Sequence, residues 1–376
     1  MLSLQTRREL VARWRAEYVV ASRLEKGRIL NSVCDATEWN RKYAIGALAK
    51  QPVASPKQKR KRKQTYGPNE EAALVKVWRL SDYLASKRLA PFLEEFVTSL
   101  ERHSELSLPE TTRAKLVVMS ASTIDRLLKK HRSSHPRSLS MTRPGSLLKK
   151  HVAVRMGNGW NDDRPGYFEI DSVAHSGGST EGEFFWTLSL IDVCTGWYEG
   201  APLRTKGQAE TLRQLKSVRA RLPFKILGLD SDNGSEFLNW HLVKFCEENG
   251  IQFTRCRPYH KNDQCRVEQK NASVVRRHTG YARYDSENQF KLLIKIHGLL
   301  RLLVNFFEPS LKGKQKAMTP YRRLLATGTL DEEQRNKLQE IYAGLNPVSL
   351  RRELNKTKAE LYELGNLVSF LDDASE

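Results

Sequence analysis

The sequence predicts a mixed α/β domain in the second half of the chain, preceded by two helical regions. Three observations predict this organisation. Apolar residues near the N-terminus recur at helical spacing, and apolar runs of strand length begin at Gly166. Two segments rich in proline, serine and basic residues separate the regions. At 376 residues the chain has room for two or three domains.

Basic charge is concentrated in the first part of the chain. Residues 1–150 hold 31 Lys and Arg against 14 Asp and Glu, a net charge of +17. Residues 151–376 carry only +3, so the whole chain has a formal net charge of +20. A strongly basic region attached to a nearly neutral one is typical of proteins that bind polyanions such as nucleic acids. A basic solvated surface has the same composition.

Cysteine usage and hydropathy favour a cytoplasmic protein without a membrane segment. Five cysteines are scattered along the chain with no Cys-x-x-Cys pair, which fits a reducing compartment. We expect Cys34 and Cys194 to pack in the interior. No apolar run approaches the ~18 residues of a membrane span, and the first residues lack the apolar centre of a signal peptide.

Residues 1–51 are predicted to form a helical DNA-binding domain. After a first helix with an apolar stripe, a short helix from about 26 to 33 and a polar turn precede another helix from about 40 to 50. Arg41 and Lys42 stand near the start of that last helix. This order is typical of a helix-turn-helix, although a plain helical hairpin gives the same pattern. We expect Arg41 and Lys42 to contact DNA bases or phosphates.

Residues 52–68 form a predicted basic linker with six cations in seven consecutive positions. Like charges at this density repel each other and keep the backbone extended until it meets a polyanion. The run lies along DNA, on the phosphate backbone or in a minor groove, or serves only as a solubilising tether. The cations we expect to contact DNA are Lys59, Arg60, Lys61, Arg62 and Lys63.

Residues 69–132 are predicted to form a second helical domain that binds DNA. An apolar face begins this region, and its last helix starts at Ser120, a good N-cap residue, and ends in basic residues that include Lys129. Residues 133–165 are rich in Ser, Pro, Arg and Gly and form a second predicted linker.

Residues 166–310 show the patterns of a mixed sheet with helices on its faces. Three strands in hairpin order are followed by alternating helices and strands. The predicted strands are 166–174, 183–194, 196–203, 224–230 and 251–256, and the predicted helices are 206–221, 235–249, 262–280 and 287–306. Residues 311–376 form a predicted C-terminal region that is helical over 318–365.

Three carboxylates in this domain are the candidate catalytic residues and metal ligands. Asp171 lies inside an apolar run, where a charge is costly unless it is compensated. Asp232 follows 60 residues later at the end of another apolar run, and Glu268 follows after 35 more, in a helical stretch. Oxygen ligands from distant strands and a helix are how proteins hold Mg²⁺ for phosphoryl chemistry.

Other acids compete for these roles, namely Asp192, Asp230, Glu236 and Asp263. Asp230 is the strongest of them, because it lies two residues from Asp232 and points to the same face of an extended segment. Asp232 is favoured because Asn233-Gly234, a turn signal, follows it directly.

Three motifs occur in order around the carboxylates: Ile170-Asp171-Ser172, the run Ser231-Asp232-Asn233-Gly234-Ser235-Glu236-Phe237, and 257–263 with 267–271. Together they resemble the catalytic core of DDE transposases and retroviral-type integrases. The 35 residues before Glu268 match the spacing of that superfamily. The front half is similar to the helix-turn-helix regions of bacterial insertion-sequence transposases.

The resemblance implies an RNase H-like fold, with Asp171 on the first strand, Asp232 just after the fourth and Glu268 on a helix. It implies DNA cleavage at element ends, and joining of the freed 3′-hydroxyl to target DNA. The three carboxylates would hold two Mg²⁺ (or Mn²⁺) ions, with Asp171 shared between them. Lys261 and Asn271 share a helix face with Glu268, so we expect them to hold the DNA end.

Further expectations follow from the same resemblance. His260 steadies a water or a phosphate, or is a structural loop residue. No zinc-binding set of His and Cys precedes the core, so we expect no structural zinc. Joining two DNA ends requires a homo-oligomer on DNA, in the nucleoid of a bacterial cytoplasm. A DNA-binding protein with an inactive core and an RNase H-type nuclease are the alternatives.

Overall fold

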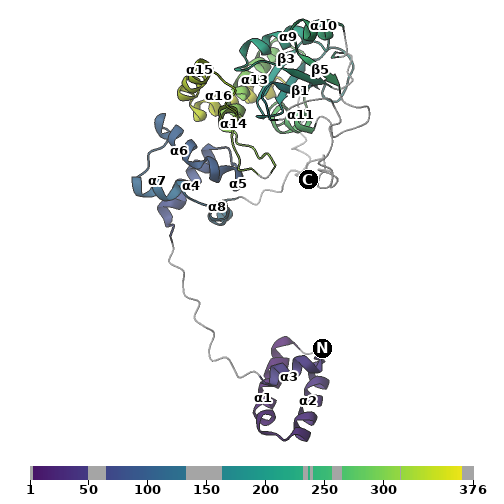
Figure 1. Ribbon diagram of the computed structural model, residues 1–376, viewed down its shortest axis with the longest axis vertical. Coiled ribbons are helices and arrows are strands. Elements are labelled where there is room, and N and C mark those ends of the chain that lie inside the picture. Colours follow the sequence, from purple (N-terminus) through teal and green to yellow (C-terminus); the bar gives the residue numbers. More distant parts are fainter. Residues whose placement is uncertain are drawn as a thin grey trace. The chain divides into compact units, whose positions relative to one another are not determined.

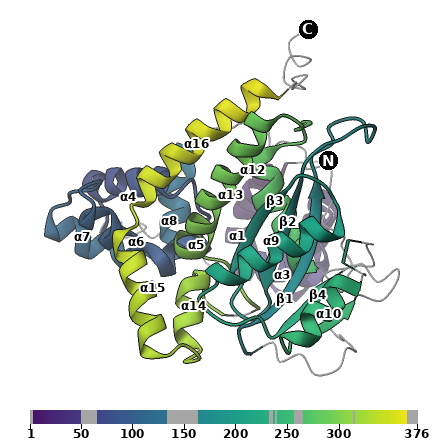
Figure 2. The same ribbon diagram turned by 90° about the horizontal axis from the view of Figure 1, so that it is seen from above.

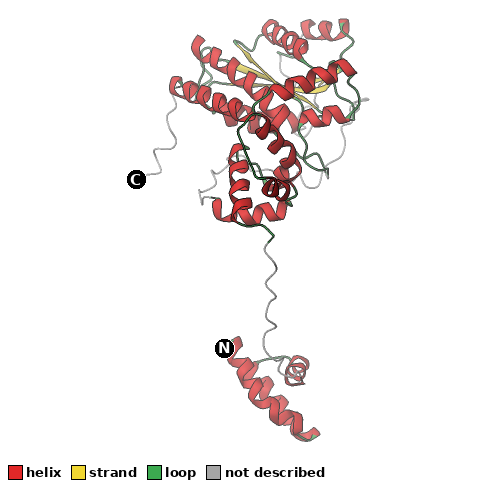
Figure 3. Cartoon of the chain, turned by 90° about the vertical axis from the view of Figure 1, so that its left-hand side faces the viewer, coloured by secondary structure: helices red, strands yellow, loops and turns green. Residues whose placement is uncertain are grey.

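A computed structural model of the chain describes residues 3–49, 65–132, 163–231, 236–237, 240–255, 265–313 and 315–365. The chain divides into two compact units, Met1–Thr65 and Tyr66–Glu376. Helices make up most of both units, and the sheet lies in the second (Figures 1 and 3). Several residues singled out from the sequence lie outside the described ranges, namely Lys59, Arg60, Lys61, Arg62, Lys63, Asp232, His260, Lys261 and Asp263.

The first unit is a three-helix domain with its own small core. Helices α1 (Leu4–Val20), α2 (Arg23–Thr37) and α3 (Arg41–Ala49) surround a cluster of buried apolar residues. Helix α2 is longer than the predicted 26–33, because Ser22 and Glu25 form a capping box at its start. It ends at Glu38 in the left-handed conformation, with φ of 58°. This turn separates α2 from α3 by three residues. The helix-turn-helix interpretation of these two helices stays a prediction.

The second unit contains the predicted mixed five-stranded sheet. Its strands are β1 (Tyr167–Ala174), β2 (Trp186–Asp192), β3 (Tyr198–Leu203), β4 (Gly228–Ser231) and β5 (Gln252–Arg255). The spatial order is β3-β2-β1-β4-β5, so β1 is central. β1, β2 and β3 pair antiparallel, whereas β4 and β5 join the other edge in parallel with β1. All five predicted strands are confirmed, each to within a few residues at its ends.

One face of the sheet is covered by α9 (Gln208–Arg221) and α10 (Trp240–Glu248), as Figure 2 shows. Alternate residues of β1, including Phe168 and Ile170, pack against them in an apolar core. Helix α10 begins at Trp240 and not at the predicted 235, because Glu236 is held in a turn before the helix. Glu236 Oε1 accepts a hydrogen bond of 2.9 Å from the Ser172 hydroxyl and lies 2.9 Å from Lys206 Nζ.

The opposite face is covered by α11 (Cys265–Lys270), a π-helical turn η4 (Asn271–Arg276), α12 (Arg277–Thr279) and α13 (Glu287–Phe307). The sequence predicted one regular helix over 262–280. In the described part, from 265 to 279, a widened turn interrupts it at Asn271. Widened turns of this kind are often found at functional sites.

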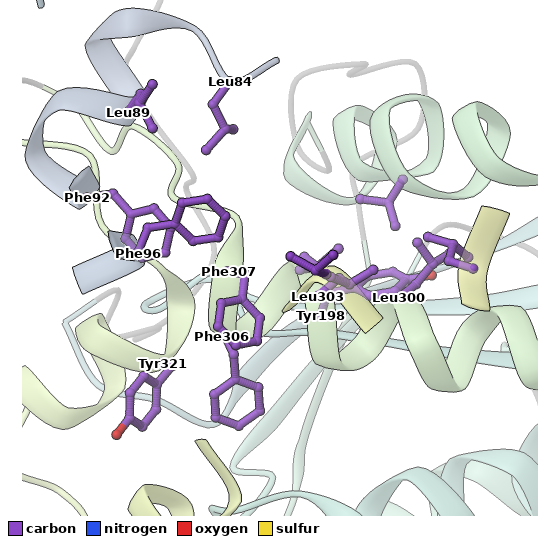
Figure 4. Packing of buried hydrophobic residues seen from close by; sticks show 14 of the residues in the cluster. Leu84, Leu89, Phe92, Phe96, Tyr198, Leu300, Leu303, Phe306, Phe307 and Tyr321 are labelled. Atoms are coloured by element: carbon purple, nitrogen blue, oxygen red, sulfur yellow. The ribbon is translucent and has the colours of Figure 1, made fainter. Parts of the chain in front are cut away.

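Residues 66–132 and the C-terminal region share one hydrophobic core with the sheet domain. The N-terminal helices of this unit are α4 (Pro68–Leu80), α5 (Ser86–Leu89), η1 (Ala90–Phe92), α6 (Leu93–Arg102), α7 (Glu110–Val117), α8 (Ala121–Leu128) and η2 (Lys129–His131). The C-terminal helices are α14 (Pro320–Ala326), α15 (Glu332–Gly344) and α16 (Pro347–Leu364). Figure 4 shows Phe92 and Phe96 in the same cluster as Phe306 and Phe307.

Ion pairs add to this packing. Arg322 of α14 lies 2.9 Å from a carboxylate oxygen of Glu95 in α6, and Arg352 of α16 lies 3.3 Å from Glu105. Residues 66–132 are therefore part of the larger unit, and DNA binding by them stays a prediction. Cys194 is buried and Cys34 half-buried. In the part of the chain described, no helix has the length and apolarity needed to cross a membrane.

Candidate active site

A buried glutamate attaches the start of α11 to the central strand. Glu169 lies on β1 with its side chain fully buried. Its Oε2 accepts hydrogen bonds of 3.0 Å from the backbone N–H groups of both Arg266 and Val267, in the first turn of α11. The first N–H groups of a helix have no partner within the helix, and a carboxylate there also meets the positive end of the helix dipole. Glu169 therefore fixes where α11 begins.

Asp171 makes a second attachment one step further along the same face of β1. Asn271 Nδ2 donates a hydrogen bond of 2.7 Å to Asp171 Oδ2. The other carboxylate oxygen of Asp171 accepts from the Ser172 backbone N–H at 2.7 Å. Asp171 is half-buried, so its charge is compensated by these donors, as a carboxylate in an apolar strand requires.

A third contact closes the series at the end of the strand. The Arg276 guanidinium donates to the carbonyl oxygen of Ala174 at 2.6 Å. Along β1, these three contacts reach successive turns of the helical segment from α11 to the end of η4. The strand and this helical segment therefore run side by side in the same direction. Side chains on the surface of α11 that faces β1 therefore lie toward Asp171.

Glu268 lies on α11 between the first two attachments. It is three residues before Asn271 and is exposed, whereas Val267 is buried against the sheet. Residues three apart in a helix are neighbours on its surface. Glu268 is therefore on the side of α11 that Asn271 presents to Asp171. That Asp171 and Glu268 serve one site stays a prediction.

Asp230 faces the neighbouring strand. It is opposite Glu169 in the parallel ladder between β1 and β4, and opposite Thr254 in the ladder to β5. Its Oδ1 accepts a hydrogen bond of 2.8 Å from the Thr254 hydroxyl, and only 8% of the residue is exposed. This buried contact stabilises the pairing of β4 and β5.

Asp232 lies outside the described residues, directly after the last residue of β4. The last pair of the ladder between β1 and β4 joins Ile170 to Ser231. Asp171 and Asp232 are the next residues along their respective chains. Their closeness in space stays a prediction.

Two of the competing acids are engaged in structural contacts. Asp192 accepts hydrogen bonds from the backbone N–H groups of Gly166 and Thr195, at 2.8 and 2.7 Å, and from the Thr195 hydroxyl at 2.6 Å. Burial raises the pKa of Asp192, while these donors oppose that rise. Asp192 thus closes the turn between β2 and β3. Glu236 is likewise buried against Ser172 and Lys206.

The oxygen donors around Asp171 fit a hard divalent cation. No cluster of three His, Cys, Asp or Glu residues occurs among the described residues, a range that excludes Asp232. Asp171 and Glu268 supply carboxylate oxygens, the ligands that Mg²⁺ and Mn²⁺ prefer. Within the described part of the chain, the buried Oδ1 of Asn271 accepts no hydrogen bond. An uncompensated buried oxygen beside a carboxylate is an environment that a cation or its bound water satisfies.

The predicted DNA-contacting residues are spread over both units. Arg41 and Lys42 are exposed at the start of α3, and the Arg41 guanidinium donates to the side-chain oxygen of Asn31. Lys129 is exposed in η2. Asn271, which we expected to hold the DNA end, donates to Asp171 instead. Contact with DNA stays a prediction for all four residues.

Glu169 was not singled out from the sequence, although a signal was present. It lies two residues before Asp171, so the alternation of a strand places both on one face. A second carboxylate inside the same apolar run needs compensation for the same reason as the first. Its partners, Arg266 and Val267, are far from it along the chain, so the sequence alone does not reveal its role.

The sequence matches the integrase core domain family over residues 162–261, which includes Asp171 and Asp232 and ends before Glu268. The chain is 40% identical over 319 residues to the uncharacterized protein y4rM of Sinorhizobium fredii (strain NBRC 101917 / NGR234), covering 84% of this chain and 90% of that protein.

Two solved structures are also similar. The catalytic core domain of BIV integrase is 19% identical, with a TM-score of 0.32 over 43% of this chain and 95% of that one. The HTLV-2 integrase catalytic core domain in complex with magnesium (dimeric form) is 15% identical, with a TM-score of 0.31 over 42% and 94%. With its five-stranded mixed sheet and its close relative of nearly equal extent, the chain belongs to the integrase core domain family, whose members are generally polynucleotidyl transferases.

Proposed function

We propose that the protein is a DDE-type transposase, which cleaves DNA at the ends of an insertion sequence and joins the freed 3′-hydroxyl groups to target DNA. The observation that carries the proposal is the hydrogen bond of 2.7 Å between Asn271 and Asp171. It holds the helix that bears Glu268 against the central strand that bears Asp171. Asp232 follows β4, the strand next to β1.

Asp171, Asp232 and Glu268 are the proposed ligands of two Mg²⁺ or Mn²⁺ ions. When bound, such a pair of ions activates the attacking oxygen and stabilises the leaving oxygen in an in-line displacement at phosphorus. In this proposal, Asp171, Asp232 and Glu268 would together hold the ions through their carboxylate oxygens. A water molecule serves as the nucleophile for cleavage, and a DNA 3′-hydroxyl for strand transfer, so no nucleophilic side chain is required.

Neighbouring residues hold this site in position. Asn271 orients the Asp171 carboxylate by its amide N–H, while Glu169 fixes the start of α11 and thereby the position of Glu268. Carboxylates gathered in one place repel each other when no cation is bound. Rigid attachment of α11 at both ends keeps the ligands together against this repulsion, which is the preorganisation a catalytic site needs.

DNA recognition is assigned to the basic N-terminal part of the chain. Arg41 and Lys42 in α3 and the cations of the 52–68 linker are the proposed contacts to the terminal repeats, with Lys129, Lys261 and Asn271 closer to the core. Because residues 1–150 carry a net charge of +17, binding should release many counterions and weaken steeply with salt. Two DNA ends must be joined together, so we propose a homo-oligomer on DNA.

The test is a cleavage and strand-transfer assay with the full-length protein. Duplexes carrying the DNA that flanks the coding region are incubated with Mg²⁺ or Mn²⁺ and a supercoiled target. We expect nicking at the element ends and joined products, and loss of both by at least ~10²-fold in Asp171→Asn, Asp232→Asn and Glu268→Gln. Glu247→Gln, which neutralises an exposed glutamate of α10, is the control and should keep full activity.

Three outcomes would overturn the proposal or parts of it. Full strand transfer by Asp232→Asn would remove that residue from the site. Specific DNA binding with no nicking in either metal would indicate a DNA-binding protein with an inactive core. Cleavage of RNA–DNA hybrids in preference to duplex ends would indicate an RNase H-type nuclease.

A further inference from the structure

A second site lies on the other flank of α11. A cavity of about 360 Å³ opens between the end of β2, α11, the C-terminal end of α13, α14 and the short helix α5. On a helix with 3.6 residues per turn, Lys270 lies more than half a turn around from Glu268. Lys270 and Gln269 line the cavity, and Glu268 does not. The cavity is therefore separated by the helix itself from the carboxylates.

The lining of this cavity is strongly basic. Its charged residues are six cations and one acid, Arg88, Arg266, Lys270, Arg277, Lys312, Arg323 and Glu308. Two of the cations have carboxylate partners elsewhere. Arg266 lies 3.2 Å from Glu169, and Arg277 lies 2.7 Å from Asp82. Arg88, Lys270 and Arg323 have no such pair among the ion pairs of the described residues.

Lys270 is half-buried and lines the cavity. Within the described part of the chain, its ammonium group makes no hydrogen bond and has no carboxylate oxygen within 4.0 Å. Arg88 and Arg323 line the same cavity. Like charges gathered in one place repel each other unless an anion compensates them, so this arrangement favours a bound anion.

Arg323 is also buried, with 8% of its surface exposed. Its terminal nitrogens donate to neutral acceptors only, at 3.1 Å to the Thr195 carbonyl and 2.8 Å to the Ser310 hydroxyl. Among the described residues no acceptor faces its buried Nε–H. Burial lowers the pKa of Arg323. A guanidinium so deep in the protein without a carboxylate carries uncompensated charge and one unsatisfied donor.

Arg88, from α5, also lines the cavity. Its Nε donates to the Pro309 carbonyl at 2.6 Å, which holds the side chain of α5 against the end of α13. Burial lowers its pKa, Glu308 opposes this shift, and Arg277 adds to it. Glu308 is the sole acid of the lining and lies 3.9 Å from Arg351, which draws it toward another partner.

We propose that this cavity is a phosphate-binding site, held by Lys270, Arg323, Arg88 and Lys312. A phosphate group presents several acceptor oxygens and up to two negative charges. Guanidinium groups match such oxygens with paired N–H donors, and lysine supplies a compact point charge. A single carboxylate would leave more positive charge uncompensated. The half-buried Lys312 lines the same cavity, and its Nζ donates to the Cys194 carbonyl at 2.9 Å.

The phosphate has two possible sources with the same chemistry. It is either a backbone phosphate of bound DNA or a small free phosphate such as pyrophosphate. The site is independent of the carboxylate cluster, so its test uses binding and not catalysis. Failure of the proposed transposase activity and failure of this proposal are therefore distinguishable.

The first arm of the test measures free phosphate. Pyrophosphate is titrated into the full-length protein in metal-free buffer at constant ionic strength, and binding is followed by thermal unfolding and by calorimetry. We expect a saturable rise in Tm. In Lys270→Met, which keeps the length of the side chain and removes its charge, affinity should fall about tenfold or more. Lys291→Met removes an exposed cation of α13 outside the cavity and should behave as wild type.

The second arm measures DNA. The binding constant for a duplex is determined as a function of salt concentration for wild type, Lys270→Met and Lys291→Met. If a backbone phosphate enters the cavity, Lys270→Met should lower the slope of log K against log salt by about one, relative to both other proteins. Pyrophosphate should then compete with the duplex for wild type.

Each outcome decides between these possibilities. A pyrophosphate effect that depends on Lys270, with an unchanged salt slope, supports a free phosphate, and a changed slope supports DNA. If wild type shows no saturable pyrophosphate binding and the three salt slopes agree, the proposal is overturned. Should Lys270→Met fail to fold, Lys312→Met replaces it in both arms, with the same expectations.

Discussion

The Asn271 amide donates its hydrogen bond to the carboxylate of Asp171 across 100 positions of sequence. Asn271 is also the first residue of the π-helical turn that widens the helix after α11. The widened turn therefore begins where the helix meets the candidate metal ligand. Single π-helical turns inside α-helices are rare and are frequently found at functional sites. The contact with Asp171 places this one beside the candidate site.

Removing this amide tests the role of Asn271 as a positioning residue. In Asn271→Ala we expect strand transfer to fall by roughly tenfold or more, because Asp171 loses the donor that orients it. The concentration of Mg²⁺ or Mn²⁺ needed for half-maximal activity should rise as well. The measurement is the strand-transfer rate over a metal titration at saturating DNA.

A purely structural role for Asn271 would give a different pattern. It would lower stability and leave the metal dependence of the remaining activity unchanged. Asn271→Asp provides a second comparison, since it keeps the size of the side chain but places a negative charge beside Asp171. Because the added charge attracts cations, this variant should need less metal than Asn271→Ala, and an equal or greater requirement would contradict the placement of Asn271 beside the metal site.

Glu169 should matter for stability more than for chemistry. Glu169→Gln keeps the shape of the side chain but loses the charge that pairs with Arg266 and accepts two backbone N–H groups at the start of α11. Breaking a buried charged cap of this kind should cost about 2–4 kcal/mol in the free energy of unfolding. Denaturant titration of the full-length protein measures this cost.

The matched comparison for Glu169→Gln is Asp171→Asn, two residues further along the same face. Asp171 is half-buried and belongs to the proposed metal site, so neutralising it should leave stability nearly unchanged or raise it. If both variants lost the same stability, the distinction between a structural and a metal-binding carboxylate on β1 would be wrong.

The sheet and most helices could be predicted because their patterns are local. Strand β1 alternates two sets of residues, and α13 carries an apolar stripe over its whole length from Glu287 to Phe307. The start of α10 could not be predicted, because Glu236 is drawn into a turn by Ser172 and Lys206, which are distant in the sequence. The π-turn at Asn271 depends in the same way on its contact with β1.

The function was predicted from the spacing of the three carboxylates. The basic cavity could not be predicted from the spacing of its residues. Its cations Arg88, Lys270 and Arg323 come from three helices, and each by itself looks like an ordinary surface charge. Only folding reveals that they lie around one cavity, where none of them forms an ion pair with a carboxylate of the described residues. A catalytic site can be predicted from short motifs, because each ligand has a recognisable local sequence around it. A binding pocket formed by single residues from separate helices has no such local sequence.

Deletion of the three-helix unit tests whether DNA recognition and DNA cleavage reside in different parts of the chain. Residues 1–65 form a compact unit with its own core, so removing them should leave the second unit folded. We expect the shortened protein to lose binding specific for the element ends and to keep metal-dependent nicking of DNA. The salt dependence of DNA binding should also become shallower, because many cations are removed. Footprinting and salt titration measure both effects, and an unchanged footprint would contradict the assignment.

Buried histidines predict how stability depends on pH. The His297 ring lies between Thr187 and Tyr198, with its Nε2 at 3.0 Å from the Thr187 hydroxyl and its Nδ1 at 3.1 Å from the Tyr198 hydroxyl. His175 Nε2 lies 2.8 Å from the same threonine hydroxyl. Burial is the main cause that lowers the pKa of both rings. The pKa of His297 is about 3, and the nearby cation Arg221 contributes to this lowering.

His278 adds a third buried ring, at 5% exposure, whose pKa is lowered to about 3 chiefly by burial and also by nearby Lys358 and Arg277. In the unfolded chain these histidines titrate near the ordinary value of 6.5. Above that pH both states are neutral, and stability is complete. As the pH falls below 6.5, the histidines bind protons in the unfolded state but not in the folded state, so stability is lost.

At pH 5.5 the loss should be about 1.4 kcal/mol each for His278 and His297, and His175 adds to it in the same direction. Most carboxylates remain charged at this pH, so the histidines dominate the change. Denaturant titrations at pH 7.5 and 5.5 measure it, and the variant His278→Gln should lose about 1.4 kcal/mol less than wild type between the two pH values. Equal free energies of unfolding at the two pH values would mean that these rings accept protons in the folded protein, which their burial beside arginines and lysines opposes.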